Sequence, residues 1–139
     1  MENVVNWIKG AFAAIGAAGA FIWGAWDPII IVLVAMVSID YVTGVISAGI
    51  RHELTSEAGF KGLLKKVVIF MIVAVGALID RIIPATNEAV RTAVCMYYIA
   101  NEGLSILENA SEMGLPLPNV LKKMLGQIGS EVEDDVDAG

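Results

Sequence analysis

Long apolar runs separated by short polar links form the dominant pattern of this chain. Three runs rich in aliphatic and small residues cover about 6–26, 28–50 and 63–83, and a weaker run covers about 89–107. A helix needs roughly 20 mostly apolar residues to cross a lipid bilayer. The pattern therefore predicts an all-α, polytopic integral membrane protein with three to four transmembrane helices in a single membrane domain, residues 1–128.

The fourth run is apolar only in its first half. Its second half carries polar residues spaced three and four apart, which form one polar face on a helix. These residues are Asn101, Glu102, Ser105, Glu108 and Asn109. Two interpretations stay open for this run, a genuine transmembrane span and an amphipathic helix that lies on the membrane.

The first run is unusually rich in alanine and glycine. Gly16, Ala20 and Gly24 follow one another at intervals of four residues, and small residues at this spacing let helix backbones approach closely within a membrane. Tryptophans flank the run at both ends, as in an interfacial belt. We expect a span with these three residues as helix-packing positions, although a flexible or surface-lying segment is the alternative.

Outside these runs the chain is polar. The link at 51–66 carries four basic residues. Residues 119–128 are typical of a short amphipathic helix, for which Asn119 is a suitable N-cap. The last segment, 129–139, holds five acids and little that could be buried, which predicts a disordered, solvated tail.

Lysine and arginine indicate the orientation, because cytoplasmic loops carry an excess of both. With four spans, seven of the nine basic residues fall on one side, and only Arg81 and Arg91 fall on the other. This distribution would place both termini in the cytoplasm. With three spans, the termini would lie on opposite sides of the membrane.

The overall composition agrees with lipid as the main environment. Hydrophobic residues make up 57% of the chain, charged residues only 17%, and the mean hydropathy is +0.72, whereas soluble domains carry about 25% charge. No basic strip with interleaved aromatic residues is present, which argues against a nucleic-acid partner. The single cysteine, Cys95, excludes an intrachain disulfide and suits a small packing residue.

Catalytic chemistry is not indicated by the residues. The single histidine, His52, lies between charged neighbours in a polar link and reads as a surface residue. No Ser/His/Asp set, metal-ligand spacing or phosphate-binding loop occurs. We therefore expect no enzyme activity, no cofactor and no bound metal.

Asp40 lies about half-way along the second run, where a charged residue costs on the order of 2.5–3.5 kcal/mol on insertion scales. Asp40, Thr43, Gly44 and Ser47 fall at i, i+3, i+4 and i+7 and form one stripe of a helix. That stripe should face another helix, another subunit or water rather than lipid. Asp80, near the end of the third run, is a further candidate, although it could also reach the headgroups.

Three functional interpretations follow from carboxylates within spans. Polar stripes of several subunits could meet around a water-filled hole, or the carboxylates could carry protons in a small coupled transporter or channel. In the third interpretation, the acids only join helices to one another.

Several stretches resemble the phage holin and toxin-secretion holin family found in phages of Gram-positive bacteria. They are "DYVTGVISAG" (40–49), "SEAGFKGLLKK" (56–66), "LID" (78–80) and "YYIANEGLSILENASEMGLPLP" (97–118), followed by "LKKML". Their order and spacing are compatible with the family over about 29–125. The positions that match its motifs are Asp40, Thr43, Gly44, Gly62, Lys66, Asp80, Asn101, Glu102, Ser105, Glu108, Asn109, Pro116 and Pro118.

The resemblance implies a protein that accumulates in the host cytoplasmic (inner) membrane, forms homo-oligomers and opens the membrane at a set time. Its partners would be the lipid bilayer, further copies of itself and a released endolysin or toxin, with an antiholin as a possible regulator. Family members have no catalytic residue and are commonly drawn with three spans, so the small-residue-rich first run departs from the pattern. An antiholin of similar sequence is an alternative function.

A physical route to membrane opening follows from the polar stripes. Lateral association would bury the stripes against one another, and a large ring turned inside out would expose them to water. We hypothesise that Asp40, Thr43, Gly44, Ser47 and Asp80, with the polar face at 101–109, take part in assembly or line the pore.

Overall fold

The computed structural model describes residues 1–121, 123–124 and 127. Its elements are the helices α1 (Glu2–Trp23), α2 (Pro28–Ile50), α3 (Ser56–Ile82) and α4 (Ala89–Glu112) and the short 3-10 helix η1 (Pro84–Thr86). The predicted all-α fold is confirmed. Of the predicted C-terminal helix, the described residues are helical, and the predicted acidic tail at 129–139 lies outside the described residues.

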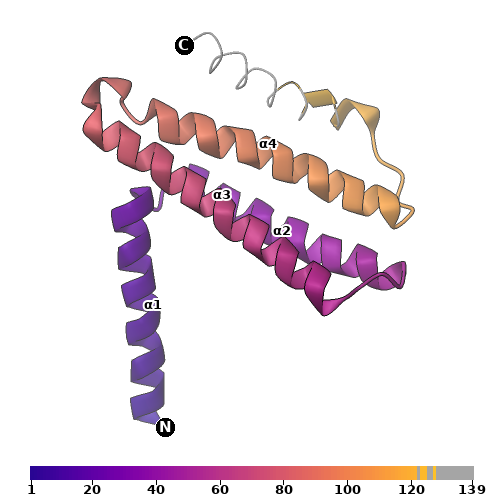
Figure 1. Ribbon diagram of the computed structural model, residues 1–139, viewed down its shortest axis with the longest axis horizontal. Helices are drawn as coiled ribbons and strands as arrows, with labels where there is room; N and C mark the ends of the chain where they lie inside the picture. Colours follow the sequence, from indigo (N-terminus) through magenta and orange to yellow (C-terminus); the bar gives the residue numbers. More distant parts are fainter. Residues whose placement is uncertain (122, 125–126, 128–139) are drawn as a thin grey trace.

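Helices α2, α3 and α4 lie side by side and form a three-helix bundle, whereas α1 leaves one end of the bundle at a steep angle (Figure 1). Contacts fix the directions within the bundle. Arg91 meets Asp27 at one end and Glu112 meets Ser47 at the other, so α4 runs parallel to α2. Helix α3 runs antiparallel to both, because it returns the chain between them.

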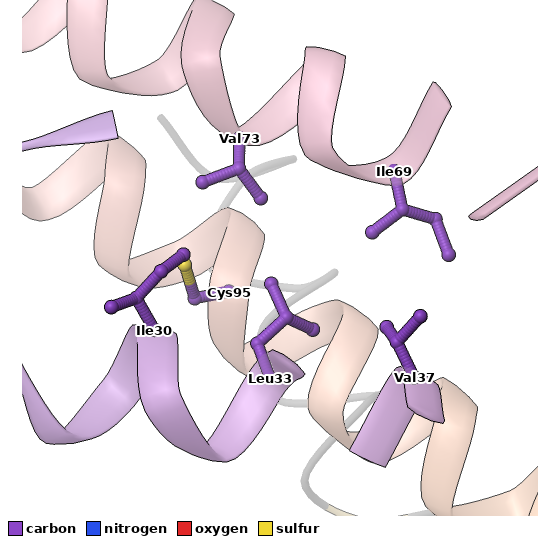
Figure 2. Packing of buried hydrophobic residues seen from close by; sticks show 6 residues of the cluster. All are labelled: Ile30, Leu33, Val37, Ile69, Val73 and Cys95. Atoms are coloured by element: carbon purple, nitrogen blue, oxygen red, sulfur yellow. The ribbon is translucent and has the colours of Figure 1, made fainter. Parts of the chain in front are cut away.

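The apolar core occupies the half of the bundle near the start of α2. It consists of Ile30, Leu33, Val37, Ile69, Val73 and Cys95 (Figure 2). The three α2 residues follow one another at three- and four-residue spacing, so they share one helix face. Cys95 is fully buried within this cluster, which confirms its predicted role as a small packing residue.

The outer surfaces of the bundle are apolar, as the hydropathy predicted. Long stretches of α2 and α3 expose large aliphatic side chains, among them Ile39, Val42, Val68 and Val75. Helices α1, α2 and α3 are each long and apolar enough to cross a membrane. Helix α4 is less apolar and lies along α2 and α3 from one end of the bundle to the other.

Helix boundaries follow local capping chemistry. The Asp27 carboxylate accepts a hydrogen bond from the Ile30 N–H at 3.2 Å, and Pro28 occupies the first turn of α2. Thr55 caps α3 in the same way through the Ala58 N–H at 3.1 Å. Because of this cap, α3 begins at Ser56, earlier than the apolar run at 63–83, and the polar link shrinks to residues 51–55.

One of the three predicted helix-packing residues does not lie in a helix. α1 ends at Trp23, and Gly24 follows in the turn with φ of 88°, a conformation that favours glycine. A Cβ at Gly24 would stand 3.4 Å from the Arg91 side chain. The prediction for Gly24 is wrong because α1 ends before it, whereas Gly16 and Ala20 lie in α1 and are half-buried. The Trp26 indole donates to the Gly16 carbonyl at 2.9 Å.

Candidate functional site

A layer of polar side chains crosses the interior of the bundle beyond the apolar core. We call Asp40, Thr43, Lys66, Glu102 and Asn109 the polar layer. The Lys66 ammonium of α3 donates to the Asp40 carboxylate of α2 and, at 2.7 Å, to the Glu102 carboxylate of α4. Asp40 is only 6% exposed and Glu102 only 2%. One amine thus joins carboxylates from the other two helices.

Asn109 extends the layer by joining α4 to two successive turns of α2. Its amide nitrogen donates to the Asp40 carboxylate at 2.9 Å, to the Asp40 backbone carbonyl at 3.1 Å and to the Thr43 hydroxyl at 2.9 Å. Gly44 lies against this amide, and a Cβ there would stand 3.6 Å from the Asn109 nitrogen. Three helices are therefore held together by hydrogen bonds at a depth where lipid could supply none.

The layer continues toward the 51–55 link. Ser47 is almost fully buried and donates to the Glu112 carboxylate at 3.1 Å. The same carboxylate accepts from the Arg51 guanidinium at 3.1 Å. Polar contacts thus line the α2–α4 seam from Asp40 to the end of both helices.

A cavity of about 320 Å³ opens beside the polar layer, between α2, α3 and α4. Asp40, Lys66 and Asn109 contribute to its wall, together with Gly44, Gly62, Ser105 and Glu108. The Lys66 side chain is 18% exposed as a result. The layer is therefore enclosed by helices on most sides but is reachable from the surface on one side.

A second polar cluster fixes the opposite end of the bundle. The Arg91 side chain is only 3% exposed, and it donates to the Asp27 carboxylate at 2.8 and 3.1 Å. It also donates to the backbone carbonyls of Trp23 and Ala25. These hydrogen bonds from the guanidinium hold the pKa of the Asp27 carboxyl below its usual value. Arg91 thus clamps the turn that connects α1 to α2.

Asp80 belongs to this second cluster. Its carboxylate accepts from the Thr86 hydroxyl at 2.6 Å and from the backbone N–H groups of Val90 and Arg91 at 3.2 and 2.8 Å. Those N–H groups begin α4, whose N-cap residue provides no side-chain hydrogen bond. Asp80 therefore caps α4 from a neighbouring helix.

The arrangement of these groups is not that of a catalytic centre. Among the described residues, no group of three or more His, Cys, Asp or Glu side chains could hold a metal ion. The polar layer combines two carboxylates with one ammonium, and hydrogen bonds satisfy every buried side-chain polar atom of the described chain. Such a set can bind helices together, carry a proton or be hydrated when the helices separate.

The structure sorts the predicted candidates into separate groups. Asp40, Thr43, Glu102 and Asn109 come together in the polar layer, and Gly44 and Ser105 line the adjoining cavity. Ser47 lies further along the same seam, whereas Asp80 belongs to the opposite end of the bundle. Asn101 and Glu108 are exposed and take no part in the layer.

Sequence reasoning from composition missed the partners of these groups. The sequence pattern places Lys66 in a polar link, and only the family motif singles it out; Arg91 and Glu112 are not among the predicted candidates. A signal was present for Lys66, since it directly precedes the aliphatic stretch that begins at Val67. A carboxylate buried within a span, such as Asp40, also predicts a cationic side chain at a similar depth, because it needs a partner there.

Comparisons with known proteins point in one direction. The model of the bacteriophage holin family matches residues 17–130. A "Probable holin" of Bacillus phage phi105 is 35% identical over 133 residues, which is 92% of this chain and 97% of that protein. An "Uncharacterized 14.9 kDa protein in nagH 3'region" of Clostridium perfringens is 38% identical over 131 residues, which is 94% of this chain and 99% of that protein. No solved structure matches the chain.

Proposed function

This chain belongs to the bacteriophage holin family, and from that premise we propose that it oligomerises in the host cytoplasmic membrane and forms lesions. An endolysin, or a toxin, would leave the cell through these lesions. The released protein would need no binding site on this chain, because a large lesion passes any folded protein of suitable size.

The observation that carries this proposal is the polar layer inside an apolar exterior. In the closed bundle, Asp40, Lys66 and Glu102 satisfy one another, so a single copy is compatible with lipid. If α4 separates from α2 and α3, these groups need water instead. A closed protomer thus stores a hydrophilic surface, and its exposure in an assembly of many copies would stabilise an aqueous opening.

Release of a folded protein is the direct test. Purified protein is inserted into vesicles that contain an enzyme-sized fluorescent protein together with a small dye. Holin activity predicts that both cargoes escape once the surface density of the protein passes a threshold. Retention of the large cargo at every density would contradict the proposal. An antiholin would release neither cargo and would delay release when mixed with an active holin.

A proton- or ion-coupled transporter is the second candidate, because Asp40 and Lys66 of the polar layer line a cavity that opens to the surface, and Lys66 also binds Glu102. In that case the vesicles should stay tight to the large cargo. Proton or ion flux would then saturate with substrate concentration. The vesicle experiment with two cargoes distinguishes the two functions, because only a holin releases the large cargo.

A further inference from the structure

The outward surface of α4 differs from those of its neighbours. Over residues 31–50 of α2, and between the exposed Lys65 and Arg81 of α3, the exposed residues are aliphatic, methionine or small. The exception is Ser38, and its hydroxyl donates to the Val34 carbonyl of its own helix at 2.8 Å. Within α4, by contrast, Asn101 and Glu108 are exposed on the surface.

Asn101 is the unusual residue of this surface because of its depth. It follows Arg91, at one end of the bundle, by ten residues, which corresponds to about 15 Å along a helix. This is about half the hydrocarbon thickness of a bilayer. Within the part of the chain that the structure describes, no donor or acceptor pairs with its amide, whereas Glu102, the next residue, is bound to Lys66.

The residues around Asn101 have the spacing of a two-stranded helix contact. Tyr97, Asn101, Leu104 and Glu108 follow one another at intervals of four, three and four residues, whereas Val94, one step earlier, packs against the core and Gly76 of α3. The spacing of four, three and four is the a/d pattern of a coiled-coil seam, in which one asparagine at an a position fixes a parallel pair in register. We call Tyr97, Asn101, Leu104 and Glu108 the α4 strip.

We propose that the α4 strip is a contact surface between two copies of this chain, with the Asn101 amides hydrogen-bonded to each other. A second copy fits because an amide is both donor and acceptor, and because copies inserted in the same orientation place Asn101 at the same depth. Lipid offers the amide no partner. The proposal deepens the proposed function, on which it rests for the premise that copies associate in a membrane.

Glu108 limits how the two copies meet. It follows Asn101 by two turns, about 10 Å along the helix, and its side chain borders the cavity beside the polar layer. Two Glu108 carboxylates in one seam repel each other unless they are hydrated. The copies therefore approach most closely at Asn101 and diverge toward Glu108, where the cavity admits water.

Disulfide cross-linking in vesicles tests the surface. With Cys95 replaced by alanine, Leu104→Cys places a single thiol on the strip. Val68→Cys on α3 is the matched control, because Val68 is exposed and lies two residues from Lys66, as Leu104 lies two residues from Glu102. Oxidation should give covalent dimers of the Leu104→Cys protein and few of the Val68→Cys protein. Equal dimer yields at both positions would overturn the proposal.

Replacement of Asn101 supplies the second arm. Asn101→Leu should weaken association about 3- to 30-fold, as expected for one lost interhelical hydrogen bond, and Asn101→Gln should retain much of it. Unchanged association of Asn101→Leu would overturn the proposal. If dimers form at Leu104 but wild-type protein releases no large cargo, the contact stands and the holin function fails. If cargo escapes without Leu104 dimers, the function stands and this contact fails.

Discussion

The inward and outward faces of α4 use polar residues for different purposes. On the inward face, Glu102 and Asn109 are bound by groups of α2 and α3. On the outward face, Asn101 lies at a similar depth without a partner from the described chain. The neighbours Asn101 and Glu102 therefore illustrate how one helix can satisfy its own fold and still present a hydrogen-bonding group to another molecule.

This difference gives each face its own expected phenotype. Changes on the inward face should destabilise the single copy, because they leave a buried charge or polar group unpaired. Changes on the outward face should leave the single copy intact and alter only association. Four substitutions test this division, from the largest expected effect on stability to the smallest.

Lys66→Met should have the largest effect. It leaves Asp40 and Glu102 buried together without a cation, and breaking a buried ion pair costs about 3–5 kcal/mol. The free energy of unfolding in detergent micelles, measured by helical circular dichroism, should fall by that amount. The matched control is Lys65→Met, at an exposed neighbouring position. Equal stability of the two variants would show that the polar layer does not hold the bundle together.

Asp27→Asn should have the next largest effect. It keeps a side chain that can cap α2 but removes the charge that faces Arg91, at a cost of about 1.5–3 kcal/mol for hydrogen bonds to a charged group. Because the pKa of Asp27 is lowered in the fold, its contribution is present above the ordinary value of 3.8 and lost as pH falls through the lowered value. The wild-type and Asp27→Asn unfolding midpoints should therefore converge in acid, and a constant difference would contradict this account.

Asp80→Ala should have a smaller effect, because it removes the cap that α3 supplies to α4. Loss of a capping side chain costs about 0.5–2 kcal/mol. Asp80→Asn should lose less, since an amide oxygen still accepts from the N–H groups of Val90 and Arg91. Amide hydrogen exchange in the first turn of α4 measures the effect locally, and unchanged protection in Asp80→Ala would exclude the capping role.

Asn101→Leu should have the smallest effect on the single copy. Its unfolding free energy should stay within about 0.5 kcal/mol of the wild type, as is usual for surface positions. A large loss of stability would show that Asn101 belongs to the fold of one chain. The division between the two faces of α4 would then be wrong.

The sequence predicted the helices better than their contacts. The run at 28–50 coincides with α2, because Pro28 and the polar residues after Ile50 bound an uninterrupted apolar stretch. The spacing of 101–109 predicted a polar face but could not tell which side of it points inward, since Asn101 and Glu102 both belong to it. That distinction depends on how α4 is rotated against α2 and α3.

The pairing of Asp40 with Lys66 was also beyond the sequence pattern. It depends on the antiparallel register of α2 and α3, which the Thr55 cap and the short 51–55 link determine. The loss of Gly24 from its predicted helix has a similar origin, because the position of the turn is set by Arg91, which is distant in sequence. The number of membrane spans, three or four, and the orientation of the termini stay predictions.

A reversible lock on the bundle tests the central claim, that the polar layer must open for a lesion to form. Ile30 and Cys95 lie in the same core cluster of α2 and α4 (Figure 2), so Ile30→Cys provides a partner for the native thiol. Ile39→Cys, at an exposed α2 position, is the matched control. In vesicles loaded with the large fluorescent protein, oxidised Ile30→Cys protein should retain the cargo, and addition of a reductant should release it. Release by the oxidised, cross-linked protein at the rate of the reduced protein would contradict the account.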